Sequence, residues 1–168
     1  LTIDPKAHID PIGALMIFLF GFGYAKPVPV RMRYFKKPKR DMALVALAGP
    51  VSNLIQAFVF MFFYSACSFA TLRAENMIAE YMGIFFFFAA VINVNLAVFN
   101  LLPIPPLDGS RLATALLPSK YYFKVMQYER QITIVLFILL VTGILSAPIN
   151  ILSDKILNLL YAITQIPF

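Results

Sequence analysis

Asp108 is the acidic residue whose position points most clearly to chemistry. It stands in the string NLLPIPPLDGSR, residues 100–111, directly after a run of 22 residues without a charge. The prolines of this string end the preceding helix, and non-helical backbone near membrane depth is tolerated only where protein buries it or water reaches it. A carboxylate there needs a cation. Asp108 is therefore either a ligand or proton acceptor in a polar cavity, or a loop residue that caps a helix beginning near Ser110.

Asn53 is the second candidate, because it places an amide inside a long apolar run. It follows the pair Gly49-Pro50 by about one helical turn, and the proline should kink the helix and free a backbone carbonyl. We expect Asn53 to face the interior of a helix bundle. There it either bonds that carbonyl or a neighbouring helix, or meets a substrate. Asn93 and Asn100, seven residues apart in the next run, share one helical face that should also look inward.

A complete zinc site cannot be built from these residues alone. Catalytic zinc takes three protein ligands and keeps one open position, whereas the chain has a single histidine, His8, far in sequence from Asp108. The serines lie in no GxSxG or other nucleophile context, which argues against a serine hydrolase.

The composition places these residues in a membrane protein. Hydrophobic residues make up 61% of the 168 and charged residues 13%, against about 45–50% and about 25% in soluble domains. Disorder, coiled coil, collagen-like repeats and nucleic-acid-binding modules are excluded. The net charge of +6 does not indicate a nucleic-acid partner, because seven of the fourteen cations lie between Lys26 and Arg40, as in a juxtamembrane cluster next to lipid.

The apolar runs predict an all-α polytopic membrane protein, one transmembrane domain with three to four transmembrane helices. The expected spans are residues 42–72, 81–102 and 131–148. Residues 12–23 would form a helix of only about 18 Å, so we expect a re-entrant or interfacial segment. Residues 149–168 fit an amphipathic helix on the interface or the bundle, or a further span.

The loops predict the orientation. Residues 26–40 carry seven cations and no acid, residues 73–80 net −1, and residues 103–130 net +2. Because cytoplasmic loops collect Lys and Arg, residues 26–40 and 103–130 should be cytoplasmic. Prolines at 27 and 29 and the alternation that follows suggest that residues 26–40 form a small β ribbon. Its edge could pair with an extended polypeptide, or the segment is only a topology anchor on anionic lipid.

The motifs together resemble the site-2 protease family, the zinc intramembrane metalloproteases of the M50 class. GPVSN in one span and NLLPIPPLDGSR closing the next carry the likeness, and AHIDPIG, FGFGYAKPVPV, ALAGPVSN and FNLLPIPPLDG follow the order of its short bacterial branch. The resemblance covers roughly residues 1–117. It implies cleavage of peptide bonds in transmembrane protein substrates.

The resemblance also implies roles for individual residues. In this family two histidines of an HExxH helix and the aspartate of the LDG motif hold zinc, and that aspartate falls on Asp108. The GxxxN asparagine falls on Asn53, and the NxxP element falls on Asn100 and Pro103. Both elements would meet the unwound substrate segment.

The sequence departs from the family in lacking HExxH. In relatives that helix lies just upstream of the position of Leu1, so we expect this chain to be a fragment that is catalytically inactive by itself. His8, close to the missing helix, would then either support the zinc site or make only a loop hydrogen bond. Two alternatives are a non-catalytic pseudoprotease that binds membrane proteins, and a small transporter subunit in which Asp108, Asn53 and Asn93 line a polar pathway.

Overall fold

The computed structural model describes residues 9–20, 35–74, 76–116, 125 and 127–165. The chain divides into two compact units, residues 1–38 and residues 39–168. Each unit is described by itself.

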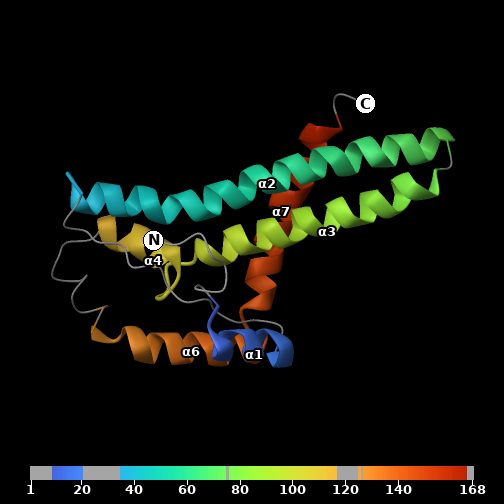
Figure 1. Cartoon of the computed structure of the whole chain (residues 1–168). Helices are drawn as coiled ribbons and strands as arrows, with labels where there is room; N and C mark the ends of the chain where they lie inside the picture. The colour runs from blue at the N-terminus through green and yellow to red at the C-terminus, as the bar shows by residue number, and fades with distance from the viewer. Residues whose placement is uncertain (1–8, 21–34, 75, 117–124, 126, 166–168) are drawn as a thin grey trace. The chain divides into compact units, whose positions relative to one another are not determined.

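The helix of the first unit is α1, Pro11–Phe20 (Figure 1). It begins at Asp10, whose Oδ1 accepts a hydrogen bond of 3.0 Å from the backbone N–H of Gly13, and Pro11 fits the first helical position because its missing N–H is not needed there. The expected short apolar segment, residues 12–23, is therefore helical up to Phe20. Residues 21–23 lie outside the described residues.

Two long antiparallel helices form the frame of the second unit. They are α2, Pro38–Ala74, and α3, Met77–Asn100, which run side by side in Figure 1. The runs 42–72 and 81–102 lie largely within them, and both helices are long and apolar enough to cross a membrane. Aromatic rings hold the pair together, with centroids 5.2 Å apart for Phe63 and Phe86 and 5.3 Å apart for Tyr64 and Phe87.

Pro50 lies inside α2 without ending it. The neighbouring Ser52 hydroxyl donates to the carbonyl of Gly49 over 2.9 Å, a local bond that is common where a helical backbone is perturbed.

The C-terminal third of the chain differs from the expected single span over residues 131–148. Helix α6, Glu129–Val141, ends before Gly143, and α7, Ser146–Thr164, follows at a bend of 77°. Gly143 has φ +73°, a conformation that glycine adopts without steric cost. The described residues thus hold two candidate spans, or three if the bent pair counts as one. The sequence predicted three to four transmembrane helices, so the prediction agrees with the structure only if there are three.

Helix α7 packs on the α2–α3 pair through one face. Ile149, Ile156 and Leu160 contact the buried cluster around Val94 and Val98 of α3. Leu152, Leu159 and Ile163, which the three- and four-residue spacing of apolar residues would place on the same face of an amphipathic helix, are instead exposed. Packing against α2 and α3 selects which of these residues are buried, because α7 buries only the face that meets them.

A buried polar contact also joins α7 to α2. The hydroxyls of Ser65 and Thr164 are 3.0 Å apart, and both residues are under 5% exposed. The ring of Tyr161 lies 5.9 Å from that of Tyr64. Interhelical hydroxyl bonds of this kind stabilise helix association in membranes.

The predicted β ribbon is not supported. The residues that the structure describes contain no strand, and Pro38, Lys39 and Arg40 form the first turn of α2. Pro38 begins a helix here because proline at the first helical position loses no hydrogen bond. The part of the expected ribbon from 26 to 34 lies outside the described residues.

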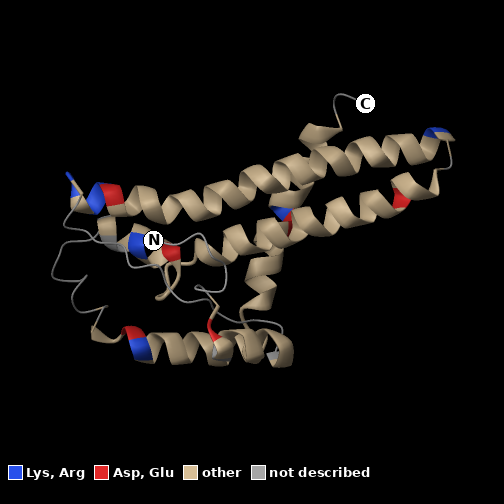
Figure 2. Ribbon diagram, viewed as in Figure 1, with Lys and Arg blue, Asp and Glu red and all other residues tan. Residues whose placement is uncertain are grey.

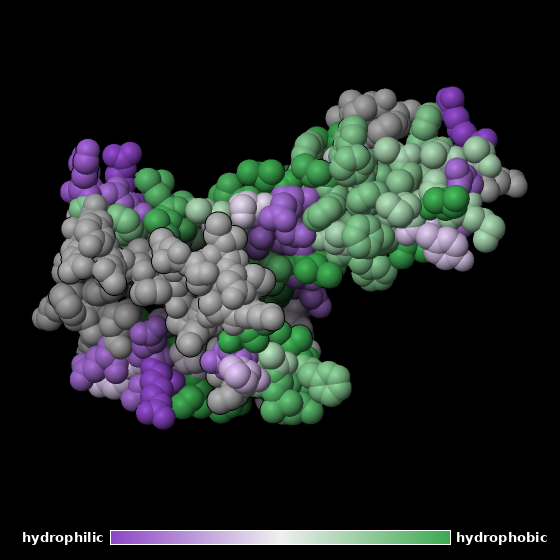
Figure 3. All heavy atoms as spheres, in the orientation of Figure 1, coloured by the Kyte–Doolittle hydropathy of each residue, from purple (hydrophilic) through white to green (hydrophobic). Residues whose placement is uncertain are grey.

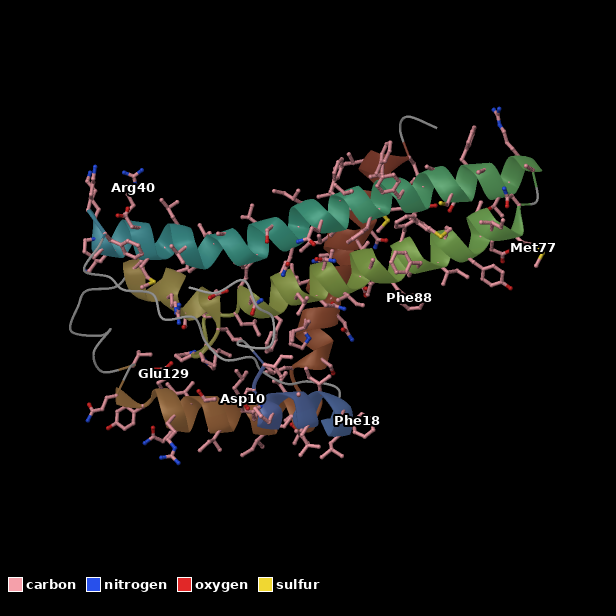
Figure 4. All side chains as sticks on the ribbon, in the orientation of Figure 1. Asp10, Phe18, Arg40, Met77, Phe88 and Glu129 are labelled. Carbon is pink, nitrogen blue, oxygen red and sulfur yellow. The ribbon has the colours of Figure 1, made fainter. Side chains whose placement is uncertain are left out.

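The acidic residues mark the starts of helices. Asp41, Glu80, Asp108 and Glu129 lie in the first turns of α2, α3, α4 (Asp108–Leu116) and α6, where the helix dipole favours negative charge. Figure 4 labels Arg40, Met77 and Glu129 at three of these starts. Asp154 is the exception among the described acids, since it lies in the middle of α7 next to Lys155 (Figure 2).

The surface of the α2–α3 pair is apolar. Phe62, Phe63, Phe85 and Phe88 are between 38% and 60% exposed, and hydrophobic residues cover much of the visible face of this pair in Figure 3. Phenyl rings in such numbers are not solvated by water at low cost. The helices are therefore those of a membrane protein, as the composition predicted.

Candidate metal and substrate site

The central contact of the candidate site joins Asp108 to Gly49. A Cβ atom built on Gly49 would lie 3.3 Å from Oδ2 of Asp108, so the carboxylate of the first residue of α4 rests against the bare backbone of α2. The two residues are 59 positions apart in sequence. They belong to the two motifs, GPVSN and LDG, that carry the family resemblance.

This contact places a carboxylate along an apolar stretch of helix. Gly49 follows Asp41, the last charged residue before the apolar part of α2, by eight residues, which is about 12 Å of helix. Half-buried at that position, Asp108 lies beside a part of α2 that contains no charge. A carboxylate at such a place is costly unless a cation or a polar cavity accompanies it.

The carboxylate of Asp108 does not serve as a cap. It makes no side-chain hydrogen bond within the described part of the chain, and α4 begins at Asp108 itself instead of near Ser110. The interpretation of Asp108 as a capping residue therefore loses its main support.

Gly109 fixes the turn that presents Asp108. A Cβ atom on Gly109 would stand 2.2 Å from the carbonyl oxygen of Leu101 and 2.4 Å from that of Leu102. Since no real Cβ approaches backbone so closely, only glycine lets the start of α4 pack on the end of α3. The glycine of LDG is thus required by packing.

Backbone and hydroxyl bonds hold the intervening loop. The N–H of Ile104 donates to Leu102 over 2.8 Å, and the N–H of Leu107 donates to Ile104 over 2.9 Å. The hydroxyl of Ser110, which is 7% exposed, donates to the carbonyl of Leu107 over 2.7 Å. These bonds satisfy backbone groups that the prolines leave outside regular helix.

Asn53 lies one turn beyond Gly49 on the same side of α2, because residues four apart share a helical face. It is half-buried, and its neighbours on that face, Pro50 and Ala57, are buried. Its amide takes part in none of the side-chain hydrogen bonds given for the described residues. Asn53 therefore adds an amide with free bonding capacity to the helix face that contacts Asp108.

The other residues predicted for the site, Asn100, Pro103, Asn93 and His8, have no described contact with Asp108. Asn100 is the last residue of α3 and is half-buried, and Pro103 is exposed in the loop. Asn93 is half-buried, but its Nδ2 donates to the carbonyl of Ala89 in its own helix over 2.9 Å. His8 lies outside the described residues.

Gly49 is the residue of this site that the sequence interpretation missed. From the sequence alone, the pair Gly49-Pro50 is assigned only to a kink, although a glycine in a helix, here one turn before Asn53, can also signal a close approach of another group to the helix.

The described residues do not form a zinc site by themselves. No group of three or more His, Cys, Asp or Glu side chains gathers among them, whereas a catalytic zinc takes three protein ligands. Asp108 fits as one oxygen ligand, because it is a carboxylate beside an apolar helix segment and pairs with no cation among the described residues. The other ligands would have to come from elsewhere.

Comparisons with known proteins agree with the motifs. The family model described as Peptidase family M50 matches residues 67–145. "Putative zinc metalloprotease YwhC" of Bacillus subtilis is 42% identical over 98% of this chain and 77% of its own length. "Putative zinc metalloprotease MJ0611" of Methanocaldococcus jannaschii is 32% identical over 60% of this chain and 48% of its own length. No solved structure matches.

The likeness to YwhC extends over nearly the whole chain and more than two thirds of that relative, and the family model covers the end of α2, all of α3, the LDG turn and α6. The chain therefore belongs to peptidase family M50, the site-2 protease family of zinc metalloproteases.

Proposed function

We propose that the chain is the substrate-binding and third-ligand part of a zinc-dependent intramembrane metalloprotease that cleaves peptide bonds of transmembrane protein substrates. The observation that carries the proposal is the contact between Asp108 and Gly49, which brings the two motifs together inside an apolar helix pair. Family membership supports the chemistry, and the burial of Asp108 supports its role.

Asp108 would bind zinc through one carboxylate oxygen and balance part of its charge. When bound in a catalytic site, zinc polarises carbonyl groups and activates water. Because Gly49 has no side chain, Oδ2 of Asp108 can lie directly against the backbone of α2.

Asn53 and Asn100 would bind the substrate backbone. A transmembrane helix must unwind locally before a peptide bond can be cut, and its freed N–H and C=O groups then have no partner in hydrocarbon. Amide side chains supply both a donor and an acceptor. Asn53 on α2 and Asn100 at the end of α3, with Pro103 after it, lie at the same end of the helix pair as Asp108.

The orientation follows from the loops. Helix α2 starts and α3 ends at this same end (Figure 1), which agrees with the placement of residues 26–40 and 103–130 in the cytoplasm by the positive-inside rule. The multi-pass protein would then reside in the cell membrane with its site toward the cytoplasmic side.

The two histidine ligands and the general base are not among the 168 residues. We propose that an HExxH helix elsewhere in the same gene product supplies them, and that these residues alone are inactive. A pseudoprotease is the second candidate, favoured by the missing motif. It would keep the fold and bind membrane proteins without cutting them.

The coding sequence before Leu1 and the zinc content of the full-length protein distinguish the protease from the pseudoprotease. The coding sequence before Leu1 should contain an in-frame HExxH, and the purified full-length protein should hold about one zinc ion per chain. An upstream sequence without HExxH, together with a zinc-free protein, would contradict the protease and favour the pseudoprotease.

A further inference from the structure

Among the residues that the structure describes, Asp154 and Lys155 are a pair of adjacent charges that the fold does not explain. They lie in the middle of α7, are both exposed, and take part in no ion pair or side-chain hydrogen bond within the part of the chain that the structure describes. The other described acids start helices. Charges on a helix that packs against membrane spans are costly when they face lipid, and they occur where a partner or water meets them.

The two residues lie on the side of α7 that faces away from α2 and α3. The buried side of the helix contains Ile149, Ser153, Ile156, Leu160 and Thr164. At 3.6 residues per turn, Lys155 and its neighbours lie about half a turn around the helix from that side. The exposed residues there are Ala147, Ile151, Asp154, Lys155, Asn158 and Ala162, and we call these six the outer face of α7.

The outer face has a symmetric pattern. Its residues are spaced by four, three, one, three and four positions, so an antiparallel copy of α7 centred between residues 154 and 155 matches it position by position. Ala147 then meets Ala162, Ile151 meets Asn158, and Asp154 meets Lys155, each contact occurring twice. Small residues at the two ends let helices approach closely, and the centre holds two ion pairs.

The direction of α7 suits such a pairing. It runs crosswise to α2 and α3 in Figure 1, and it meets α6 at 77°. Two copies with the same membrane orientation are related by a two-fold axis along the membrane normal. Helices that lie across that axis become antiparallel when they meet at it, whereas helices along the axis would be parallel.

We propose that the outer face of α7 is a homodimer interface, in which Asp154 of each copy pairs with Lys155 of the other. The partner is a second copy because the face is complementary in charge to itself and has the isologous symmetry of a two-fold contact. The proposal does not rest on the protease function, because it concerns the mass of the particle and not catalysis.

Charge reversal tests the pairing. The full-length protein in mild detergent should have the mass of a dimer by light scattering. Either Asp154→Lys or Lys155→Asp brings four like charges together at the axis and should weaken dimerisation by about a hundredfold. The double variant Asp154→Lys/Lys155→Asp should restore dimerisation. A monomeric wild type, or a double variant as weak as either single variant, would overturn the proposal.

Two further measurements separate a specific contact at the outer face of α7 from a general effect of changing the net charge. Glu80→Lys changes the net charge as Asp154→Lys does, at an exposed site in the first turn of α3, and should leave the dimer intact. In a background without other cysteines, Ile151→Cys/Asn158→Cys should give a covalent dimer in membranes on mild oxidation, without any change in charge. Failure of this cross-link in folded protein would also overturn the proposal.

Discussion

The Oδ2 atom of Asp108 lies where a methyl group on Gly49 would come within 3.3 Å of it. The acidic residue of the LDG motif thus lies against the glycine of GPVSN, where α2 has no side chain at position 49. Two motifs that are separate in the sequence therefore lie in contact in the structure.

Enlarging Gly49 should displace Asp108 in proportion to the added size. In the full-length protein, Gly49→Ala requires a shift of a few tenths of an ångström, and Gly49→Val requires more. We expect Gly49→Val to lower cleavage of a transmembrane reporter by about a hundredfold, since a misplacement near 1 Å has an effect of this order. Gly49→Ala should fall between that value and wild type.

Gly83→Ala is the matched control for Gly49. It adds one methyl group where α3 meets α2, and its Cβ would lie 3.5 Å from the Cβ of Cys67, an ordinary contact. Activity should stay within a factor of about two. If Gly83→Ala and Gly49→Val were equally impaired, the effect would come from general helix packing.

Replacing Gly109 should disrupt the LDG turn itself. The 2.2 Å approach to the Leu101 carbonyl cannot be relieved by rotating a side chain, so Gly109→Ala must move backbone. We expect a loss of about 1–3 kcal/mol in unfolding free energy, measured by chemical denaturation in detergent, together with loss of cleavage. Gly143→Ala, strained by its positive φ of 73°, should lower stability while activity persists.

Removing the amide of Asn53 should separate substrate binding from metal binding. Asn53→Ala is expected to leave zinc content unchanged and slow turnover by about 10²–10³-fold if the amide stabilises developing charge. Asn93→Ala is the comparison, because that amide bonds within its own helix, and it should cleave normally. Zinc loss in Asn53→Ala would show that Asn53 acts on the metal site instead.

The hydroxyl contact between Ser65 and Thr164 should contribute to the free energy with which α7 packs on α2. A double-mutant cycle of Ser65→Ala and Thr164→Val is expected to give a coupling free energy of about 0.6–1.7 kcal/mol, the range for polar contacts between membrane helices. Thr142→Val, whose hydroxyl bonds only to its own helix, should show no coupling to Ser65→Ala. Zero coupling for the first pair would mean that the contact of 3.0 Å does not bind α7.

The positions of α2 and α3 could be predicted from sequence because hydropathy over some twenty residues depends little on tertiary contacts. The break at Gly143 could not, since one glycine in an apolar run is compatible with a continuous helix. The ribbon prediction, which extended to residue 40, was wrong for residues 38–40 because Pro38 begins α2, and proline is favoured at the first helical position.

The site was predictable in part. The prolines and lack of charge before Asp108 identified it as unusual, and the resemblance to the family suggested its role. The contact of Asp108 with Gly49 could not be predicted in this way, because the pairing of α2 with the start of α4 depends on how Gly109 packs on Leu101, a tertiary contact. The proposed roles of Asp108, Asn53, Asn100, Pro103 and His8 stay predictions.

Zinc content of Asp108→Ala tests the central claim most directly. In the purified full-length protein, wild type should hold about one zinc ion per chain, and Asp108→Ala should lose most of that metal and all cleavage of a transmembrane reporter while keeping its helical circular dichroism. Full zinc content with full cleavage in Asp108→Ala would contradict the assignment of Asp108 as a zinc ligand.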